Sequence, residues 1–375
     1  VGSEMCIRDR YKVPNGMSYN SYVILDDKIA VMDTVDGFFT EEWLNNVEQV
    51  LDGKMPDYLV IQHMEPDHSA SIPAFLKKYP KVTVVSTAKG FQFMEQFFPE
   101  FFAEQGLPAE QRIVAANDGI LELGQHSLHF VYAPMVHWPE VMMTYEATEK
   151  ILFAADGFGK FGALDAEEEW ADEARRYYIG IVGKYGPQVQ AVLKKAAGLD
   201  IQTICSLHGP VLKENLGFYL EKYDKWSSYQ PEESGVVIAY ASVYGNTRNA
   251  AEYLADVLQE KGQKTVLYDL ARCDKAKAVA DAFRYDRLVL AGITYNGDLF
   301  PCMRSFIEGL TERNYQNRKV AIIENGTWAP MAGKLILGMF EKSKNLTFTE
   351  TTVSIKSAMN EQNKGEIGKL AEELC

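Results

Sequence analysis

Cysteine and histidine are scarce in this chain, and their placement narrows its chemistry. Among 375 residues there are six histidines and five cysteines. The cysteines are scattered and form no Cys-x-x-Cys pair, so we expect neither a disulfide framework nor a fused rubredoxin-like iron centre. They stand at Cys6, Cys205, Cys273, Cys302 and Cys375, and we expect Cys205 and Cys302 to be packing residues.

The sequence also lacks long apolar runs and any excess of basic charge. No apolar run reaches membrane-spanning length, and the formal net charge is −14. Such a charge disfavours binding to nucleic-acid phosphates. Residues 1–10 have no helix or strand pattern and no apolar signal-peptide core, and we expect them to be a non-native extension. We expect a cytoplasmic protein that binds neither nucleic acid nor membranes.

What the chain does have is a group of metal-ligand side chains directly after an apolar strand. The strand starts at Tyr58 and runs into His63, Glu65, Asp67 and His68. In an extended loop alternate side chains point the same way, so His63, Glu65 and Asp67 are expected to converge while His68 turns toward a second ion. A hydrogen-bonded polar loop is the alternative, but it needs no such cluster.

Three further ligand-type residues each follow a predicted strand. Loops past strand ends gather side chains over one edge of a sheet, so we expect all three to join the same site. They are His137 after 129–133, Asp156 after 151–155, and His208 after 201–207. His126 and His129 lie in or next to a strand and are assigned to no metal.

The seven candidates comprise four imidazoles and three carboxylates, without a thiolate. This donor set suits non-haem iron or manganese, although zinc accepts the same ligands. A carboxylate between two ions would hold them about 3.5–4 Å apart, and Asp156 is the best candidate for that bridge.

A second motif lies in the C-terminal part of the chain. An apolar strand at 235–241 ends in Ser242-Val243-Tyr244-Gly245-Asn246-Thr247, and helical periodicity follows from Arg248 to Leu258. A glycine turn, polar side chains and a helix N-terminus predict a phosphate site. The loop lacks the Gly-Lys-Ser/Thr ending of nucleoside triphosphatases and the three glycines of dinucleotide sites, so a mononucleotide is favoured.

Two other strand ends complete the expected pocket. Strands at 287–293 and 319–323 each lead into a loop with one aromatic residue, and Tyr295 and Trp328 are expected to border a flat ring there, with packing as the alternative. The residues of these loops are Thr294, Tyr295, Asn296, Gly297, Asn325, Gly326, Thr327 and Trp328.

These placements predict two domains. Residues 11–230 are expected to form an αββα sandwich, and residues 231–375 alternate strand and helix five times. The second pattern predicts a doubly wound parallel five-stranded sheet in the order 2-1-3-4-5. Pro231 and the charges around it predict a linker at 227–234.

The ligand pattern resembles the metallo-β-lactamase-like domain of the flavodiiron proteins, also called A-type flavoproteins. The resemblance rests on His63-x-Glu65-x-Asp67-His68 and the three later ligands, and extends from about Tyr11 to the C-terminus. Hydrolases of the wider superfamily generally have histidine where Glu65 stands, and an oxygen donor there favours iron over zinc. The loop from Ser242 to Thr247 resembles the FMN phosphate loop of flavodoxins, whereas the loop at Trp328 departs from the commoner Ser-Tyr-Gly-Trp form.

The resemblance implies FMN and two iron ions held by the seven residues. It implies reduction of O2 to water, of NO to N2O, or of both, with electrons from a separate donor such as rubredoxin or a flavin reductase. It also implies a head-to-tail homodimer, or a dimer of dimers, in which the FMN of one subunit faces the irons of the other. Tyr177 or Tyr178, expected just before a helix, is a candidate hydrogen-bond donor at the metals, with packing as the alternative.

Two other interpretations remain open. A zinc hydrolase fused to a flavodoxin would account for the first domain, although Glu65 and the flavin loops count against it. A flavodoxin-type electron carrier with a vestigial metal domain would account for the second, although all seven ligands are present.

Overall fold

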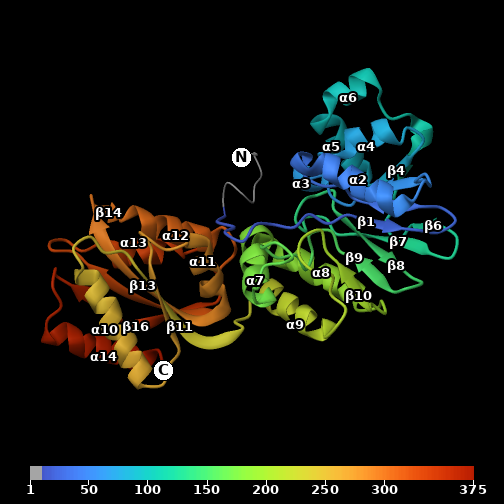
Figure 1. Cartoon of the computed structure of the whole chain (residues 1–375). Helices are drawn as coiled ribbons and strands as arrows, with labels where there is room; N and C mark the ends of the chain where they lie inside the picture. The colour runs from blue at the N-terminus through green and yellow to red at the C-terminus, as the bar shows by residue number, and fades with distance from the viewer. Residues whose placement is uncertain (1–10) are drawn as a thin grey trace. The chain divides into compact units, whose positions relative to one another are not determined.

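The computed structural model describes residues 11–375, so the expectation for residues 1–10 lies outside its described part. Two compact units divide this part of the chain (Figure 1). The first contains the residues up to Tyr177 together with Pro187–Tyr223, and the second contains Tyr178–Gly186 together with Asp224–Cys375.

Two five-stranded sheets form the centre of the first unit. The first sheet has the order β1 (Tyr22–Ile24), β2 (Ala30–Met32), β3 (Tyr58–Val60), β4 (Thr83–Ser86) and β5 (Arg112–Val114). The second has the order β10 (Thr203–Cys205), β9 (Ile151–Phe153), β8 (Met142–Glu146), β7 (Ser127–Tyr132) and β6 (Ile120–Glu122). In the first sheet β1 pairs antiparallel with β2, and β2 to β5 are parallel. In the second, β6 to β9 pair antiparallel, and β10 is parallel to β9.

Helices complete the layers of this unit. Those between β2 and β5 are η1 (Gly37–Phe39), α2 (Thr40–Leu51), α3 (Pro66–Ser69), α4 (Ile72–Lys78), α5 (Ala88–Phe97), α6 (Pro99–Glu104) and η2 (Ala109–Gln111). Those after β9 are α7 (Trp170–Ile181), η3 (Gly183–Tyr185), α8 (Gly186–Ala196) and α9 (Leu216–Ser227). Residues 178–186, which include all of η3, and residues 224–227 at the end of α9 belong to the second unit.

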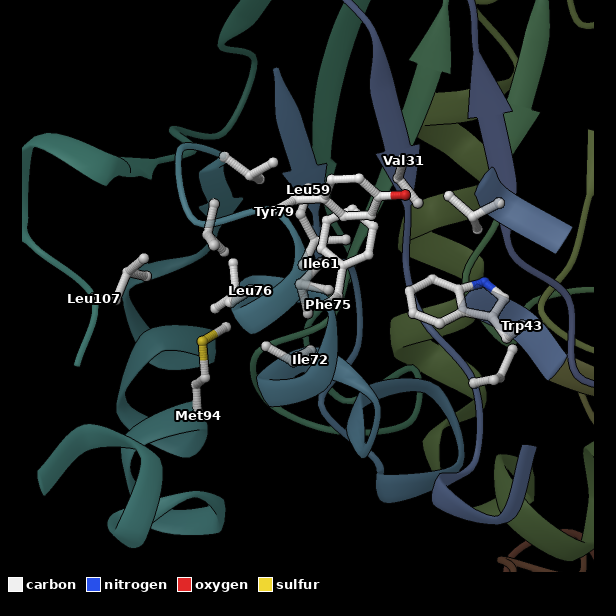
Figure 2. Close-up of a cluster of buried hydrophobic side chains, with 14 of the residues drawn as sticks. Val31, Trp43, Leu59, Ile61, Ile72, Phe75, Leu76, Tyr79, Met94 and Leu107 are labelled. Carbon is white, nitrogen blue, oxygen red and sulfur yellow. The ribbon is translucent and has the colours of Figure 1, made fainter. Parts of the chain in front are cut away.

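Strand alternation divides the core of the first unit into two layers. Val31 and Leu59 face the helices and pack in the cluster that contains Trp43 of α2 and Phe75 of α4 (Figure 2). Their strand neighbours, such as Met32, point the other way, into a second cluster shared with the second sheet. Because successive side chains of a strand point to opposite faces, each of these strands is buried on both sides. The expected αββα sandwich is confirmed.

The second unit is built on a parallel sheet. Its strands are β11 (Glu233–Tyr240), β12 (Thr265–Asp269), β13 (Tyr285–Tyr295), β14 (Asp298–Leu299), β15 (Arg318–Asn325) and β16 (Leu346–Ile355). The order β12-β11-β13-β15-β16 is the expected 2-1-3-4-5, and every pairing along it is parallel. The short β14 adds an antiparallel pairing at the end of β13 that the sequence did not predict.

Helices of the second unit cover both faces of this sheet. They are α10 (Asn246–Glu260), α11 (Lys275–Arg284), α12 (Pro301–Thr311), α13 (Ala332–Met339) and α14 (Glu361–Glu373). In Figure 1, α10 and α14 lie together on one face, and α11, α12 and α13 on the other. On the first face, Leu254 and Leu370 pack against Ile238 and Val289. The flavodoxin-like fold is confirmed.

The expected linker at 227–234 is wrong in its extent. Helix α9 continues through Ser227 and β11 begins at Glu233, so only residues 228–232 connect them. These residues are also held in place, because Trp226 Nε1 donates to Glu232 Oε1 at 2.7 Å and Tyr229 is buried. Within residues 11–375, none of the helices has the length and apolar character needed to cross a membrane.

Candidate metal centre and flavin pocket

The seven ligand-type residues lie past the ends of strands of the first unit, as expected. His63 and Glu65 follow β3, His137 lies in the turn between β7 and β8, Asp156 follows β9 and His208 follows β10, while Asp67 and His68 lie in α3. All seven side chains are buried, and the most exposed of them, His137, is 8% exposed. Neither sheet alone could assemble this set, because the residues come from both.

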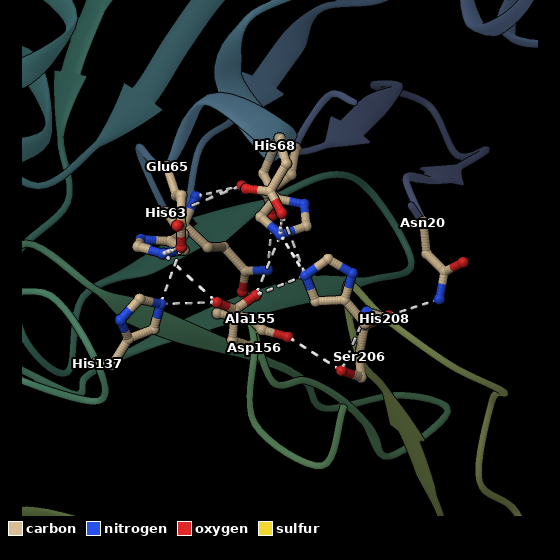
Figure 3. Close-up of polar contacts among 12 residues, drawn as sticks. Asn20, His63, Glu65, His68, His137, Ala155, Asp156, Ser206 and His208 are labelled. Atoms are coloured by element: carbon tan, nitrogen blue, oxygen red, sulfur yellow. Dashed lines mark hydrogen bonds and ion pairs between the residues drawn. The ribbon is translucent and has the colours of Figure 1, made fainter. Parts of the chain in front are cut away.

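Two groups share this site (Figure 3). The first consists of His63, Glu65, His137 and Asp156, and the second of Asp67, His68 and His208; within each group the candidate ligand atoms lie within 4.8 Å of one another. We call them the His63 group and the His208 group.

The expectation that Asp67 converges with His63 and Glu65 is wrong, because Asp67 belongs to the His208 group. The expectation treated the whole segment as extended. Glu65 is extended, with φ −60° and ψ 138°, but Pro66 starts α3. Beyond that point the side-chain period is helical, so Asp67 and His68 no longer alternate.

Asp156 lies between the two groups. Its Oδ2 atom is 3.1 Å from Nε2 of His137, and its Oδ1 atom is 3.1 Å from Nε2 of His68. One carboxylate oxygen therefore faces each group, which is the arrangement that a bridging ligand requires. Burial alone would raise the pKa of Asp156, but the imidazoles of His68 and His63 hold it well below its usual value.

Several buried polar atoms at the site have no hydrogen-bond partner among the described residues. Both carboxylate oxygens of Asp67 accept no hydrogen bond. Buried charges are costly unless they are paired or coordinate a metal ion. The donor set of imidazole nitrogens and carboxylate oxygens therefore fits two metal ions, one in each group.

Two of the ligand histidines are oriented by a polar contact at the ring nitrogen that faces away from the metal position. The sequence analysis indicated neither of the two partners. His63 Nδ1 lies 2.8 Å from Oε1 of Glu140, and His208 Nδ1 lies 2.7 Å from the carbonyl oxygen of Ser18. Glu140 stands only three residues after His137, and that proximity was a signal that could have found it. A main-chain carbonyl such as that of Ser18 gives no signal in a sequence.

Tyr177 lies inside α7, so the expectation that it precedes a helix is wrong. Its ring centroid is 5.5 Å from that of His208, and its buried hydroxyl has no hydrogen-bond partner in the described chain. Burial raises the pKa of Tyr177 well above its usual value, and the carboxylates of Asp156 and Glu65 raise it further. The hydroxyl therefore keeps its proton beside the ligands. Tyr178, which is also in α7, packs against Trp226 instead.

The two remaining histidines stay outside the metal groups, as expected. His126 Nδ1 lies 2.7 Å from Oδ2 of Asp26, and His129 Nε2 lies 3.2 Å from Oγ of Ser127. Both are partly exposed.

A cavity of about 670 Å³ lies at the carboxyl ends of the strands of the second unit. This volume is in the usual range for cofactor sites, roughly 300–1,000 Å³. Of the predicted flavin contacts, all but Gly245 line it: Ser242, Val243, Tyr244, Asn246, Thr247, Thr294, Tyr295, Asn296, Gly297, Asn325, Gly326, Thr327 and Trp328. The sequence analysis missed Ile293, Ala329, Met331 and Ser357, which also line it.

The phosphate end of this cavity is the start of α10. Gly245 is the N-cap residue of α10 with φ 89°, a conformation that favours glycine, and its N–H donates to Oγ of Ser242 at 3.1 Å. The free N–H groups of the first turn suit a phosphate. Tyr244 and Trp328 are 93% and 82% exposed at the cavity, so a flat ring could cover them. The cavity fits a flavin mononucleotide.

Comparisons with known proteins match both parts of the chain. Residues 17–209, more than half of the chain, match the model of the "ODP family beta lactamase", and residues 237–346 match that of the "Flavodoxin domain". The flavodoxin domain indicates FMN, and the buried clusters fit a di-iron centre.

Two relatives match most of this chain. Diflavin flavoprotein A 1 of Synechocystis sp. is 34% identical over 279 residues, which cover 71% of this chain and 47% of that protein. The anaerobic nitric oxide reductase flavorubredoxin of Vibrio vulnificus is 28% identical over 331 residues, covering 85% of this chain and 65% of that protein. The chain thus spans about half to two thirds of the length of these two relatives.

A solved structure has a similar fold over nearly the whole chain. The flavodiiron protein from Giardia intestinalis has a TM-score of 0.84 and 25% identity, and the match covers 99% of this chain and 92% of that one. The chain belongs to the ODP beta-lactamase family, contains a flavodoxin domain after that part, and is similar to a flavodiiron protein over nearly its whole length.

Proposed function

We propose that this chain is an oxidoreductase that reduces O2 to water, NO to N2O, or both, at a di-iron site supplied with electrons through FMN. The observation that carries the proposal is the division of seven buried ligand-type residues into two groups on either side of Asp156. This arrangement suits two neighbouring ions that act on one small molecule.

Each residue has a proposed role in holding the cofactors. His63, Glu65 and His137 would hold one ion, Asp67, His68 and His208 the other, and Asp156 would bridge them. Glu65 provides an oxygen donor, which favours iron over zinc. The loop from Ser242 to Thr247 would hold the FMN phosphate, and the loops at 294–297 and 325–328 would border its ring system.

The chemistry needs electrons, protons and protection from bulk water. When bound, FMN and two ferrous ions supply the electrons, and O2 takes up four electrons and four protons, whereas two NO molecules take up two of each. The chain buries the ligands and keeps a protonated hydroxyl, that of Tyr177, beside His208. Tyr177 is thus placed to donate a hydrogen bond at the site.

The choice of gas and the partners belong to this proposal as well. The name of the Vibrio vulnificus relative supports NO, whereas the resemblance to flavodiiron proteins supports O2 and NO alike. We propose a separate electron donor, such as rubredoxin or a flavin reductase, and a head-to-tail homodimer or dimer of dimers in the cytoplasm. We also propose that residues 11–230 form the metal-binding part of the function and residues 231–375 the FMN-binding part.

Two alternatives make different predictions. A zinc hydrolase would use the same metal ligands, but it would need neither the flavin cavity beside α10 nor the oxygen donor of Glu65. An electron carrier with a vestigial metal domain would have no need to keep seven ligands buried together.

Metal analysis together with gas consumption separates these functions. We expect protein purified without oxygen to contain two iron ions and one FMN per chain, and to consume O2 or NO when an artificial donor reduces the flavin. Zinc in place of iron, in protein made with iron available, would contradict the proposal. Protein that holds FMN but consumes neither gas would favour the electron carrier.

A further inference from the structure

The two groups of metal ligands differ in the hydrogen-bond acceptor that contacts the Nδ1 atom of a ligand histidine, on the side of the ring away from the metal position. In the His63 group the outer partner is a carboxylate, that of Glu140. In the His208 group the outer partner of His208 is a neutral carbonyl, that of Ser18, and the buried Nδ1 atom of His68 has no hydrogen-bond partner among the described residues. The two positions are therefore unequal, although their inner ligands are of the same types.

Glu140 is rigidly placed. Its side chain is buried, with 2% of the residue exposed, and Oε1 accepts both from His63 Nδ1 at 2.8 Å and from the main-chain N–H of Met64 at 3.0 Å. Its own carbonyl oxygen accepts from the hydroxyl of Thr87 at 3.0 Å. Bonds on both sides leave the carboxylate little freedom to move away from the imidazole.

Glu140 also connects the two histidines of its group. It lies three residues after His137, in the turn between β7 and β8, where the N–H of Ala133 donates to the carbonyl of Val141 at 2.9 Å. One short segment thus provides the ligand His137 and fixes the ligand His63. Its other carboxylate oxygen, Oε2, is buried without a hydrogen-bond partner in the described chain, so the negative charge of Glu140 is compensated on one side only.

A carboxylate behind a ligating histidine has a known physical effect. It fixes the orientation of the ring and makes the coordinating nitrogen a stronger donor, and its loss typically costs about 10–100-fold in metal affinity. A carbonyl orients the ring without adding negative charge. The ion of the His63 group should therefore be held more tightly than the ion of the His208 group.

We propose that Glu140 is a positioning residue that makes the His63 group the tighter of the two metal positions, so that this position fills first and empties last. This inference rests on the proposed di-iron site. Glu140 touches neither metal nor gas in this account, and acts through His63 alone.

Stepwise metal binding tests the proposal without an activity assay. Metal-free protein is titrated with Fe²⁺ under nitrogen against a competing chelator, which gives two successive dissociation constants. We expect Glu140→Gln, which keeps the shape but removes the charge, to weaken the tighter step about 10–100-fold and to change the weaker step little. Glu146→Gln is a matched control, because Glu146 is buried on β8 and, among the described residues, its carboxylate accepts hydrogen bonds only from the N–H groups of Thr148 and Glu149.

Two further variants assign the steps to the groups. His208→Ala should abolish the weaker binding step and leave one dissociation constant, close to that of the tighter step in the wild type. Adding Glu140→Gln to His208→Ala should raise this dissociation constant by the same factor as in the wild-type background. In a His63→Ala background Glu140→Gln should have no effect, because the ring through which it acts is absent. If Glu140→Gln does not fold, Glu140→Asp, which retracts the charge from His63, should likewise weaken the tighter step.

The possible failures are distinguishable. Wild-type protein that binds fewer than two ions would overturn the di-iron site itself. Two ions in the wild type, with both steps unchanged or equally weakened by Glu140→Gln, would overturn the role of Glu140 and leave the site standing. An effect on the weaker step alone would also overturn it.

Discussion

The Nε2 atoms of His68 and His208 lie 3.0 Å apart, although the two residues are separated by 140 positions in the sequence. Both rings are fully buried, and both nitrogens point toward Asp67, at 3.4 Å each. Two imidazoles can share one proton in such a contact, but a cation between them and the carboxylate satisfies all three groups.

Replacing Asp156 with Asn should remove both ions, because each oxygen of its carboxylate faces a different group. Asp67→Asn is the comparison, since Asp67 belongs to the His208 group only. We expect iron per chain to fall to near zero for the first variant and to about half for the second. Equal loss in both variants would argue against a bridging role for Asp156.

Removing the hydroxyl of Tyr177 should slow turnover without loss of iron. A hydrogen bond to a charged group is worth about 1.5–3 kcal/mol, so we expect Tyr177→Phe to reduce the rate of gas consumption roughly 10–150-fold. Tyr178→Phe is the neighbouring control, because Tyr178 packs against Trp226. Similar rates for both variants would show that Tyr177 only packs.

Thr247→Ala should weaken FMN binding. Thr247 lies in the first turn of α10, is 2% exposed and lines the cavity, so its hydroxyl is placed to donate to the phosphate. We expect a loss on the order of 1.5–3 kcal/mol, measured as the FMN dissociation constant by fluorescence. Thr311→Ala is the control, since that hydroxyl bonds to the carbonyl of Ile307 within α12. An unchanged constant for Thr247→Ala would contradict the placement of the phosphate.

Alkylation should distinguish the buried thiol of Cys205 from the exposed one of Cys375. Burial raises the pKa of Cys205 to about 11, so little of the reactive thiolate exists at mildly alkaline pH. We expect iodoacetamide to label Cys375 in the native protein long before Cys205, as read by peptide mass spectrometry. Equal labelling rates would mean that β10 opens readily next to His208. The expected packing role of Cys205 agrees with its burial.

Most of the fold was predictable because its strands are short apolar runs bounded by ligand or turn residues. The order of the parallel sheet followed from the alternation of strands and helices after residue 235, and His137, Asp156 and His208 were found because each follows such a strand. Asp67 was placed in the wrong group because a single proline, Pro66, changes the side-chain period from that of a strand to that of a helix. The spacing of polar and apolar residues does not by itself show at which residue the strand-like alternation ends and the helix begins.

The outer partners were less accessible to sequence reasoning. Glu140 is one of many carboxylates in an acidic chain, and apart from its position three residues after His137 only the tertiary contact with His63 distinguishes it. The position of Tyr177 inside α7 depends on the start of that helix at Trp170, and helix boundaries are the least reliable part of a sequence prediction. The short β14 pairs over a two-residue turn, Asn296-Gly297, which was assigned to flavin contact rather than to a hairpin.

Cross-subunit electron transfer follows from the proposed head-to-tail dimer. A His68→Ala chain lacks a metal ligand and a Thr247→Ala chain binds FMN weakly, so each homodimer should be slow. At limiting FMN we expect a mixed dimer to regain gas reduction at one of its two interfaces. A mixed dimer that contains both cofactors but regains no activity would contradict the arrangement, as would active protein that is monomeric by light scattering.

In the proposed function electrons pass from FMN to the metal centre and from there to a gas, and a single-turnover experiment tests this transfer most directly. Protein loaded with iron and reduced at the flavin is mixed rapidly with O2 or NO, and flavin absorbance and gas are followed together. We expect the flavin to reoxidise as gas is consumed, with water or N2O as product, and we expect His208→Ala to hold reduced flavin far longer. Flavin that reoxidises equally fast in both proteins, or iron-loaded wild type that leaves both gases unchanged, would contradict the account.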